Sequence, residues 1–191
     1  MKNESSNRYP TQPSAGRFLL LFFSSLLLGL SQSGAVPQDG GIPSFSEFAP
    51  GLYRGAQPTE EGYRRLKSLG IKTIVNFRNE KSEIEKEKKE AERLGMNYIS
   101  IPWVIYRNAS PTVAEKFLEA AGDPAKQPIF IHCQRGHERT GVMSALYYLR
   151  YEGLSEGEAY HKAFDRFPVR WYWEPFVKKK FDLFKSSARQ K

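Results

Sequence analysis

The feature that most constrains the fold is segment 132–141 (HCQRGHERTG), which joins a strand-like run to a helix-like run. Before it, residues 128–132 (PIFIH) have the composition of a short buried strand. After it, apolar residues recur at helical spacing from Val142 to Leu149. A loop that enters a helix in this way points several backbone N–H groups at one spot, and the helix dipole adds to that positive field. The segment therefore predicts a cradle for an anion.

Three residues of the segment give this cradle a chemistry. Gly136 allows the backbone to bend close to bound oxygens. Cys133 stands in the positive field, which favours the thiolate, the form of the side chain that attacks. Arg139, six residues later, offers a planar fork to two phosphoryl oxygens, and its attraction grows as charge builds on them. The alternative for Cys133 is a buried inert thiol, because cysteine is commonly buried.

The motif His-Cys-x5-Arg-Thr-Gly resembles the signature of the protein tyrosine and dual-specificity phosphatase superfamily. Segments 52–58 (LYRGAQP) and 71–78 (IKTIVNFR) also look like the opening of its bacterial and plant–fungal members. The resemblance implies a phosphatase of phosphotyrosine or dual-specificity type that hydrolyses phosphomonoesters through a phosphocysteine intermediate, without a cofactor or metal. By this resemblance Cys133 is the nucleophile, Arg139 holds the phosphoryl oxygens, and Thr140 hydrogen-bonds the sulfur. His132 would orient the loop as a structural residue. The expected substrate-binding residues are Gln134, Arg135, Gly136, His137 and Gly141.

The sequence departs from the family pattern at the general acid. Relatives usually carry an Asp on a loop that falls at residues 101–108 here, and this segment contains neither Asp nor Glu. Glu138, inside the phosphate loop, is the remaining candidate, either as proton donor to the leaving oxygen or as base for the attacking water. A Glu that faces solvent or pairs with an Arg is the alternative, and His137 is a second candidate acid. A missing Asp favours substrates whose leaving group needs little protonation, such as aryl or pyrophosphate esters.

Other functions fit parts of the sequence. A catalytically weak phosphate-binding module would keep the cradle and lack the acid. Basic residues at 135 and 137 make inositol polyphosphates or phosphoinositides alternative substrates by resemblance. Trp103, Tyr106 and Arg107 would line the mouth of the site, or their loop is simply pinned by aromatic packing. The spacing of His132, Cys133 and His137 is not that of a zinc site, and a single cysteine does not supply the thiol relay of an arsenate reductase.

The net charge of +8 favours anionic partners without choosing among them. Because aromatic and basic residues do not interleave on a recognisable nucleic-acid fold, we expect a phosphorylated substrate and no nucleic acid.

The N-terminal segment has the three-part layout of a secretory signal. Residues 1–17 are polar and carry basic side chains, residues 18–30 are an almost pure apolar run, and small residues follow at Gly34 and Ala35. We therefore expect a signal peptide over 1–35 and export to the periplasm or the exterior. The apolar run is shorter than the roughly 20 residues that span a bilayer. An uncleaved anchor that holds the domain outside the cytoplasm is the alternative, and membrane contact is expected only in that case.

The remaining chain predicts one α/β domain, with a central, mostly parallel, twisted sheet flanked by helices. Residues 36–50, rich in Gly and Pro, predict a linker or extended arm. The domain is expected over 51–187, with a tail over 188–191, and as a monomer. Strand-like runs occupy residues 52–56, 71–77, 98–101 and 128–132, with helical patterns between and after them. Residues 80–94, dense in Glu and Lys, predict a solvated helix.

Overall fold

The structure is a computed structural model that describes residues 40–189. Five strands form one sheet: β1 (Ser46–Ala49), β2 (Leu52–Gly55), β3 (Thr73–Asn76), β4 (Asn97–Ser100) and β5 (Ile129–His132). Their order is β1-β2-β5-β3-β4, with β1 antiparallel to β2 and the other pairings parallel. The predicted α/β architecture with a mostly parallel sheet is confirmed. The expected signal segment and residues 36–39 lie outside the described residues.

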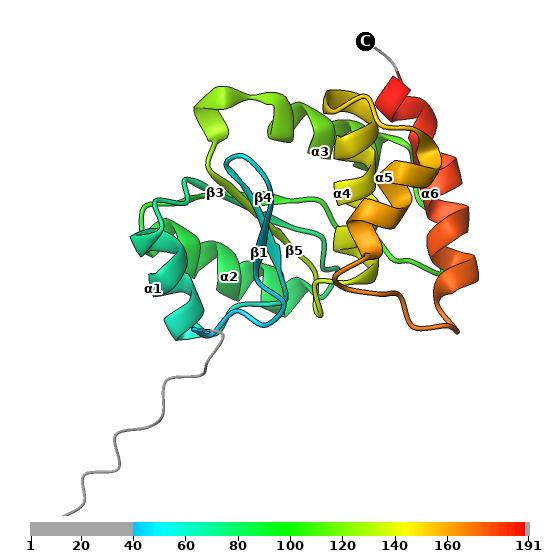
Figure 1. Cartoon of the computed structure of the whole chain (residues 1–191). Helices are drawn as coiled ribbons and strands as arrows, with labels where there is room; N and C mark the ends of the chain where they lie inside the picture. The colour runs from blue at the N-terminus through cyan, green and yellow to red at the C-terminus, as the bar shows by residue number, and fades with distance from the viewer. Residues whose placement is uncertain (1–39, 190–191) are drawn as a thin grey trace, which may run out of the picture. The chain divides into compact units, whose positions relative to one another are not determined.

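Helices cover both faces of the sheet (Figure 1). They are α1 (Glu60–Ser68), α2 (Lys81–Arg93), α3 (Thr112–Gly122), α4 (Glu138–Tyr151), α5 (Glu156–Phe164) and α6 (Glu174–Arg189), with a short 3-10 turn at Pro124–Lys126. Alternate residues of the central strands enter opposite cores, as the pleat requires. Phe130 packs in a cluster with side chains of α1 and α2. Ile131 packs in the larger cluster with side chains of α3 to α6. The sheet is thus buried on both sides.

The register of the parallel strands sets the position of the site. Gly55 at the end of β2 and Asn76 at the end of β3 both lie opposite His132, the last residue of β5. The carboxyl ends of three adjacent strands therefore meet at one level. From there the chain leaves β5, turns through residues 133–137 and enters α4 (Figure 1). In open α/β sheets this edge is where ligands bind.

Residues 42–49 belong to the domain, so the expected linker over 36–50 is wrong for this part. Residues 46–49 are strand β1, and the side chain of Ile42 is fully buried against the α1 and α2 layer. The backbone is bonded as well, since Ala56 N donates to Pro43 O at 2.7 Å and Thr59 N donates to Gly41 O at 2.9 Å. A four-residue strand beside Gly and Pro carries too little local pattern to be recognised.

The C-terminal boundary also moves. Helix α6 continues to Arg189, and Ala188 is buried in the larger core cluster, so the tail expected from residue 188 is wrong at its first two positions. Within residues 40–189, no helix combines the length and apolar character needed to cross a bilayer.

Replacing Ile42 with Ala tests whether this segment is part of the fold. We expect the free energy of unfolding to fall by about 2–5 kcal/mol, because the change leaves a cavity in a closed core. Urea unfolding measures it. Leu69→Ala removes a similar side chain that is 44% exposed and should cost much less. Equal effects of the two changes would mean that residues 40–50 contribute nothing to the core.

Candidate active site

The loop between β5 and α4 forms a cradle around the sulfur of Cys133. Gly136 N donates to Cys133 Sγ at 3.3 Å, so the loop curls over the sulfur. No side chain caps α4, whose N-cap residue is His137. The first N–H groups of a helix have no partner inside the helix, and here no side chain takes their place. This arrangement leaves them available to an anion, as the sequence predicts.

Gly136 is required by two independent features of the loop. Its φ of +75° lies in the region that disfavours side chains. A Cβ atom here would also stand 2.5 Å from the carbonyl carbon and oxygen of Gly55. The phosphate loop therefore packs backbone against backbone on the end of β2.

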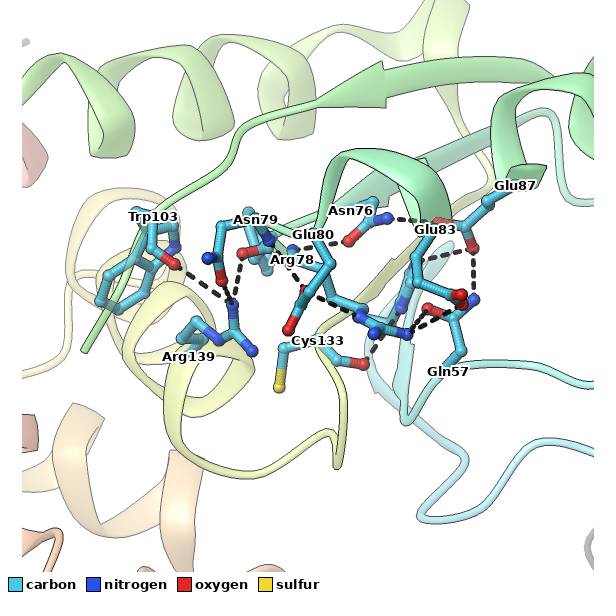
Figure 2. A network of polar contacts seen from close by, with 12 residues as sticks. Gln57, Asn76, Arg78, Asn79, Glu80, Glu83, Glu87, Trp103, Cys133 and Arg139 are labelled. Carbon is cyan, nitrogen blue, oxygen red and sulfur yellow. Dashed lines mark hydrogen bonds and ion pairs between the residues drawn. The ribbon is translucent and has the colours of Figure 1, made fainter. Parts of the chain in front are cut away.

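Arg139 is oriented through one of its nitrogens only. Its Nη1 donates to the carbonyl oxygens of Phe77 at 2.9 Å and Trp103 at 3.2 Å, and to Asn79 Oδ1 at 3.4 Å. Figure 2 shows this guanidinium beside the Cys133 side chain. Within residues 40–189, Nε and Nη2 make no hydrogen bond, which leaves that edge of the fork for two oxygens of a ligand.

A cavity of about 220 Å³ opens above these groups. Its lining residues come from the phosphate loop and from three neighbouring segments: Asn79, Glu80, Val104, Ile105, Tyr106, Cys133, Gln134, Arg135, Glu138, Arg139 and Trp173. Five of the predicted site residues therefore share one cavity. Within the described range, no group of three His, Cys, Asp or Glu side chains is placed to hold a metal ion.

Two carboxylates line this cavity. Glu138 is largely buried, and its Oε1 accepts from Arg135 Nη2 at 3.3 Å. Glu80 precedes α2 and accepts from Arg78 Nε at 3.1 Å and from Asn79 N at 3.2 Å. Partial burial acts to raise the pKa of Glu80, but these hydrogen bonds and the Arg78 charge outweigh it and lower that pKa. Only Glu138 was expected from the sequence.

A buried arginine stands behind the phosphate loop. Arg54 Nη2 donates to Gly136 O at 2.8 Å and Nη1 donates to Ala163 O at 2.7 Å. Among the described residues, no carboxylate lies within ion-pair distance of Arg54, which is 3% exposed. Burial lowers the pKa of Arg54 to about 10, and attraction to Cys133 opposes that shift. The guanidinium therefore remains charged at neutral pH, and its positive charge interacts with Cys133.

His132 is held from the side opposite the cavity. Its Nδ1 lies 3.1 Å from Cys133 O, and its Nε2 lies 2.9 Å from Glu87 Oε1. Burial opposes ionisation of Glu87, yet His132 and the hydroxyls of Tyr63 and Tyr98 outweigh it and lower the pKa of Glu87. Figure 2 shows this network continuing from Glu87 through Gln57 to Arg78. The network fixes His132 and, through it, the backbone of the nucleophile.

The domain matches a known protein family. A family model described as "DSP-PTPase phosphatase fused to NAD+ Kinase" matches residues 40–167. The chain belongs to this family.

Individual relatives show how far the likeness extends. "Probable NAD kinase 2, chloroplastic" of Oryza sativa subsp. japonica is 36% identical over 101 residues, which are 51% of this chain and 10% of the relative. "Dual specificity protein phosphatase TpbA" of Pseudomonas aeruginosa is 25% identical over 112 residues, 59% of this chain and 49% of the relative. The chain thus spans less than half the length of these curated relatives.

A solved structure resembles the domain more completely. The core catalytic domain of the PP-IP phosphatase SIW14 from Saccharomyces cerevisiae, in complex with citrate, superposes with a TM-score of 0.57 at 26% identity. The likeness covers 72% of this chain and 85% of that chain.

Other predicted residues of this DSP-PTPase domain lie away from the cavity. The His137 ring turns outward to Ser44 Oγ, at 3.2 Å, and to the ring of Phe167, and burial lowers the pKa of His137. Gly141 lies under the ring of Phe164. The buried Thr140 hydroxyl has no hydrogen-bond partner among the described residues, so its bond to the sulfur stays a prediction.

The loop expected at the mouth of this DSP-PTPase site contributes one of its three named side chains. Tyr106 lines the cavity, whereas Trp103 is buried against Phe184 and offers only its carbonyl oxygen to Arg139. Arg107 lies over the ring of Tyr106 and outside the lining. Sequence reasoning missed Arg54, Glu80 and Glu87, although Arg54 stands inside the LYRGAQP segment.

Arg54→Met should slow alkylation of Cys133 by iodoacetamide at neutral pH about tenfold or more, because the buried positive charge that favours the thiolate is lost. Arg54→Lys keeps a charge but not the fork, so it should recover part of the alkylation rate and less of the affinity for vanadate. Alkylation followed by mass spectrometry measures the rate. An alkylation rate in Arg54→Met equal to that of the parent, with the fold intact by circular dichroism, would contradict this role.

Proposed function

We propose that the chain is a cysteine-dependent phosphatase that hydrolyses phosphomonoesters of phosphotyrosine or dual-specificity type. The observation that carries this proposal is the convergence of Cys133 Sγ, an uncapped helix start and the open edge of Arg139 on one cavity. The family match and the printed functions of TpbA and SIW14 support it.

The proposed reaction has two steps. The Cys133 thiolate attacks phosphorus, the phosphorus–oxygen bond of the ester breaks, and the leaving oxygen takes a proton. Water then attacks the phosphocysteine, which releases phosphate and restores the thiolate. Arg139 and the loop N–H groups bind the three phosphoryl oxygens, whose charge is greatest in the transition state. Arg54 and His132 position the loop and do not touch the substrate.

Glu138 is the proposed source of the proton. It lies inside the phosphate loop, lines the cavity and is the more buried of the two carboxyl groups there. Glu80 does not suit this task, because its lowered pKa keeps it ionised at neutral pH.

Arg135 is 41% exposed at the side chain, so it can turn from Glu138 to a second phosphate. This observation favours inositol polyphosphates or phosphoinositides as the second candidate substrates.

Export and a monomeric state remain parts of the proposal that rest on sequence alone. The apolar run at 18–30 and the small residues before 36 support cleavage after Ala35. A mature protein that begins upstream of residue 36 would contradict the cleavage, and a dimer in solution would contradict the monomer.

A para-nitrophenyl phosphate assay tests the proposed reaction. We expect activity that vanadate inhibits and a chelator does not, and Cys133→Ser should lose it by at least about a thousandfold, because serine is a far weaker nucleophile here. Tight phosphate binding without turnover would identify a binding module instead. Activity that requires a metal ion would overturn the cysteine mechanism.

Glu138→Gln should lower turnover of alkyl phosphates about a hundredfold and of aryl phosphates less than about tenfold, because only poor leaving groups need the proton. Steady-state kcat on the two substrate classes gives the comparison. Glu80→Gln is the matched control, since it makes the same substitution at the other carboxyl group of the cavity and should leave the alkyl-to-aryl ratio unchanged. Unchanged turnover of both classes in Glu138→Gln would remove Glu138 from the mechanism.

A further inference from the structure

Aromatic side chains from two distant segments gather at the mouth of the cavity. We call this cluster the aromatic rim, and its members are Tyr106, Trp171, Tyr172, Trp173 and Phe176. The rings form a continuous series: Tyr106 stacks on Trp173 at 5.8 Å, and Trp173 contacts both Tyr172 and Phe176. Tyr106 and Trp173 also line the cavity, so the rim is continuous with the site.

The outer part of the rim is exposed to an extent unusual for such side chains. Trp171 is 85% exposed and, among the rings described, contacts only Tyr172. Tyr106, Tyr172 and Phe176 are each more than 40% exposed. Contiguous exposed apolar groups of this kind mark an interaction surface. Trp171 lies in the segment between α5 and α6, the orange segment of Figure 1.

Two arginines flank the rim. Arg170 Nη1 donates to the Tyr172 hydroxyl at 2.8 Å, and Arg107 lies over the Tyr106 ring. Within residues 40–189, neither of these guanidinium groups is in an ion pair with a carboxylate. Their charge is therefore available to an anionic partner.

Projecting indole and phenol rings beside unpaired arginines match the chemistry of an anionic lipid surface. Trp and Tyr favour the headgroup level of a bilayer, where the ring is dehydrated and the polar atom stays wet. Arg side chains there attract acidic headgroups. A peptide would need recesses for its side chains, whereas Trp171 protrudes.

We propose that the aromatic rim docks the protein on an anionic lipid surface, so that the cavity takes its phosphomonoester from a lipid headgroup. The docking depends on the rim and on the arginines beside it, while the choice of substrate rests on the proposed function. Contact through the rim would bring the mouth of the cavity, at Tyr106 and Trp173, against the headgroups.

Vesicle sedimentation of the full chain tests the docking. We expect more binding to vesicles of phosphatidylcholine with phosphatidylserine than to phosphatidylcholine alone, and weaker binding as salt rises. Trp171→Ala with Phe176→Ala should lower the partition about tenfold or more, because two large apolar side chains lose their burial. Arg170→Gln should lower it about fivefold. Leu69→Ala, an exposed apolar side chain on α1, is the matched control and should change nothing.

All these proteins carry the same N-terminal apolar run, so a difference between them reports on the rim. Equal partition of the parent and the Trp171/Phe176 double variant, with both folded by thermal unfolding, would overturn the docking.

Activity measurements test the substrate. The double variant should hydrolyse para-nitrophenyl phosphate like the parent, because neither residue lines the cavity. It should lose at least about tenfold on phosphatidylinositol 4-phosphate in acidic vesicles and little on the short-chain soluble form. A loss confined to a soluble tyrosine phosphopeptide would assign the rim to peptides and overturn the proposal. Vesicle binding by a protein inactive on every substrate would support the docking and refute the proposed function.

Discussion

The backbone contact between Gly136 and Gly55, held by Arg54, is the constraint on which the site depends. Because Gly136 has no side chain, the phosphate loop rests directly on the backbone at the end of β2, and Arg54 holds the loop there by binding Gly136 O. Arg54 binds the carbonyl oxygen of Gly136 on the side of the loop away from the cavity, so the other side of the loop faces the cavity. Burial of an unpaired guanidinium is unfavourable. Its positive charge interacts with Cys133 and adds to the field at the phosphate loop, which suits the anionic ligand of the proposed function.

A second polar system supports the loop from the α2 side. The hydroxyls of Tyr63 and Tyr98 donate to Glu87, which lies beside the imidazole of His132, and Gln57 connects Glu87 to Arg78 near the cavity. Buried polar groups stabilise a fold only where their hydrogen bonds are satisfied, and then they define a single arrangement. The Glu87 carboxylate has several partners, whereas Arg54, on the other side of the loop, has no acidic partner among residues 40–189. The loop therefore has the Glu87 carboxylate on its α2 side and the positive charge of Arg54 on its other side.

The sequence was sufficient for the features that local patterns encode. The strand before Cys133, the helix after it and the glycine between them follow from composition and spacing within residues 128–149. The same approach failed for Glu87, because a carboxylate inside a Glu- and Lys-rich helix has the pattern of a solvated residue. Its burial depends on partners from β3, β4 and β5 that only the sheet order brings together. Arg54 and strand β1 were missed for the same reason, since their contacts lie 82 or more residues away or in a neighbouring short strand.

Residues 101–108 contain no Asp, and they contribute to the site in another way. The segment supplies a carbonyl oxygen to Arg139 and a ring to the cavity mouth, so it positions the phosphate clamp and shapes access. It offers no acid. The proposed function therefore assigns proton donation to Glu138, a residue of the phosphate loop itself. A donor fixed to the loop cannot follow substrates of different length, whereas a donor on a separate segment can. Under the two proposals, discrimination between substrates is accordingly left to the groups around the mouth, which are Arg135 and the aromatic rim.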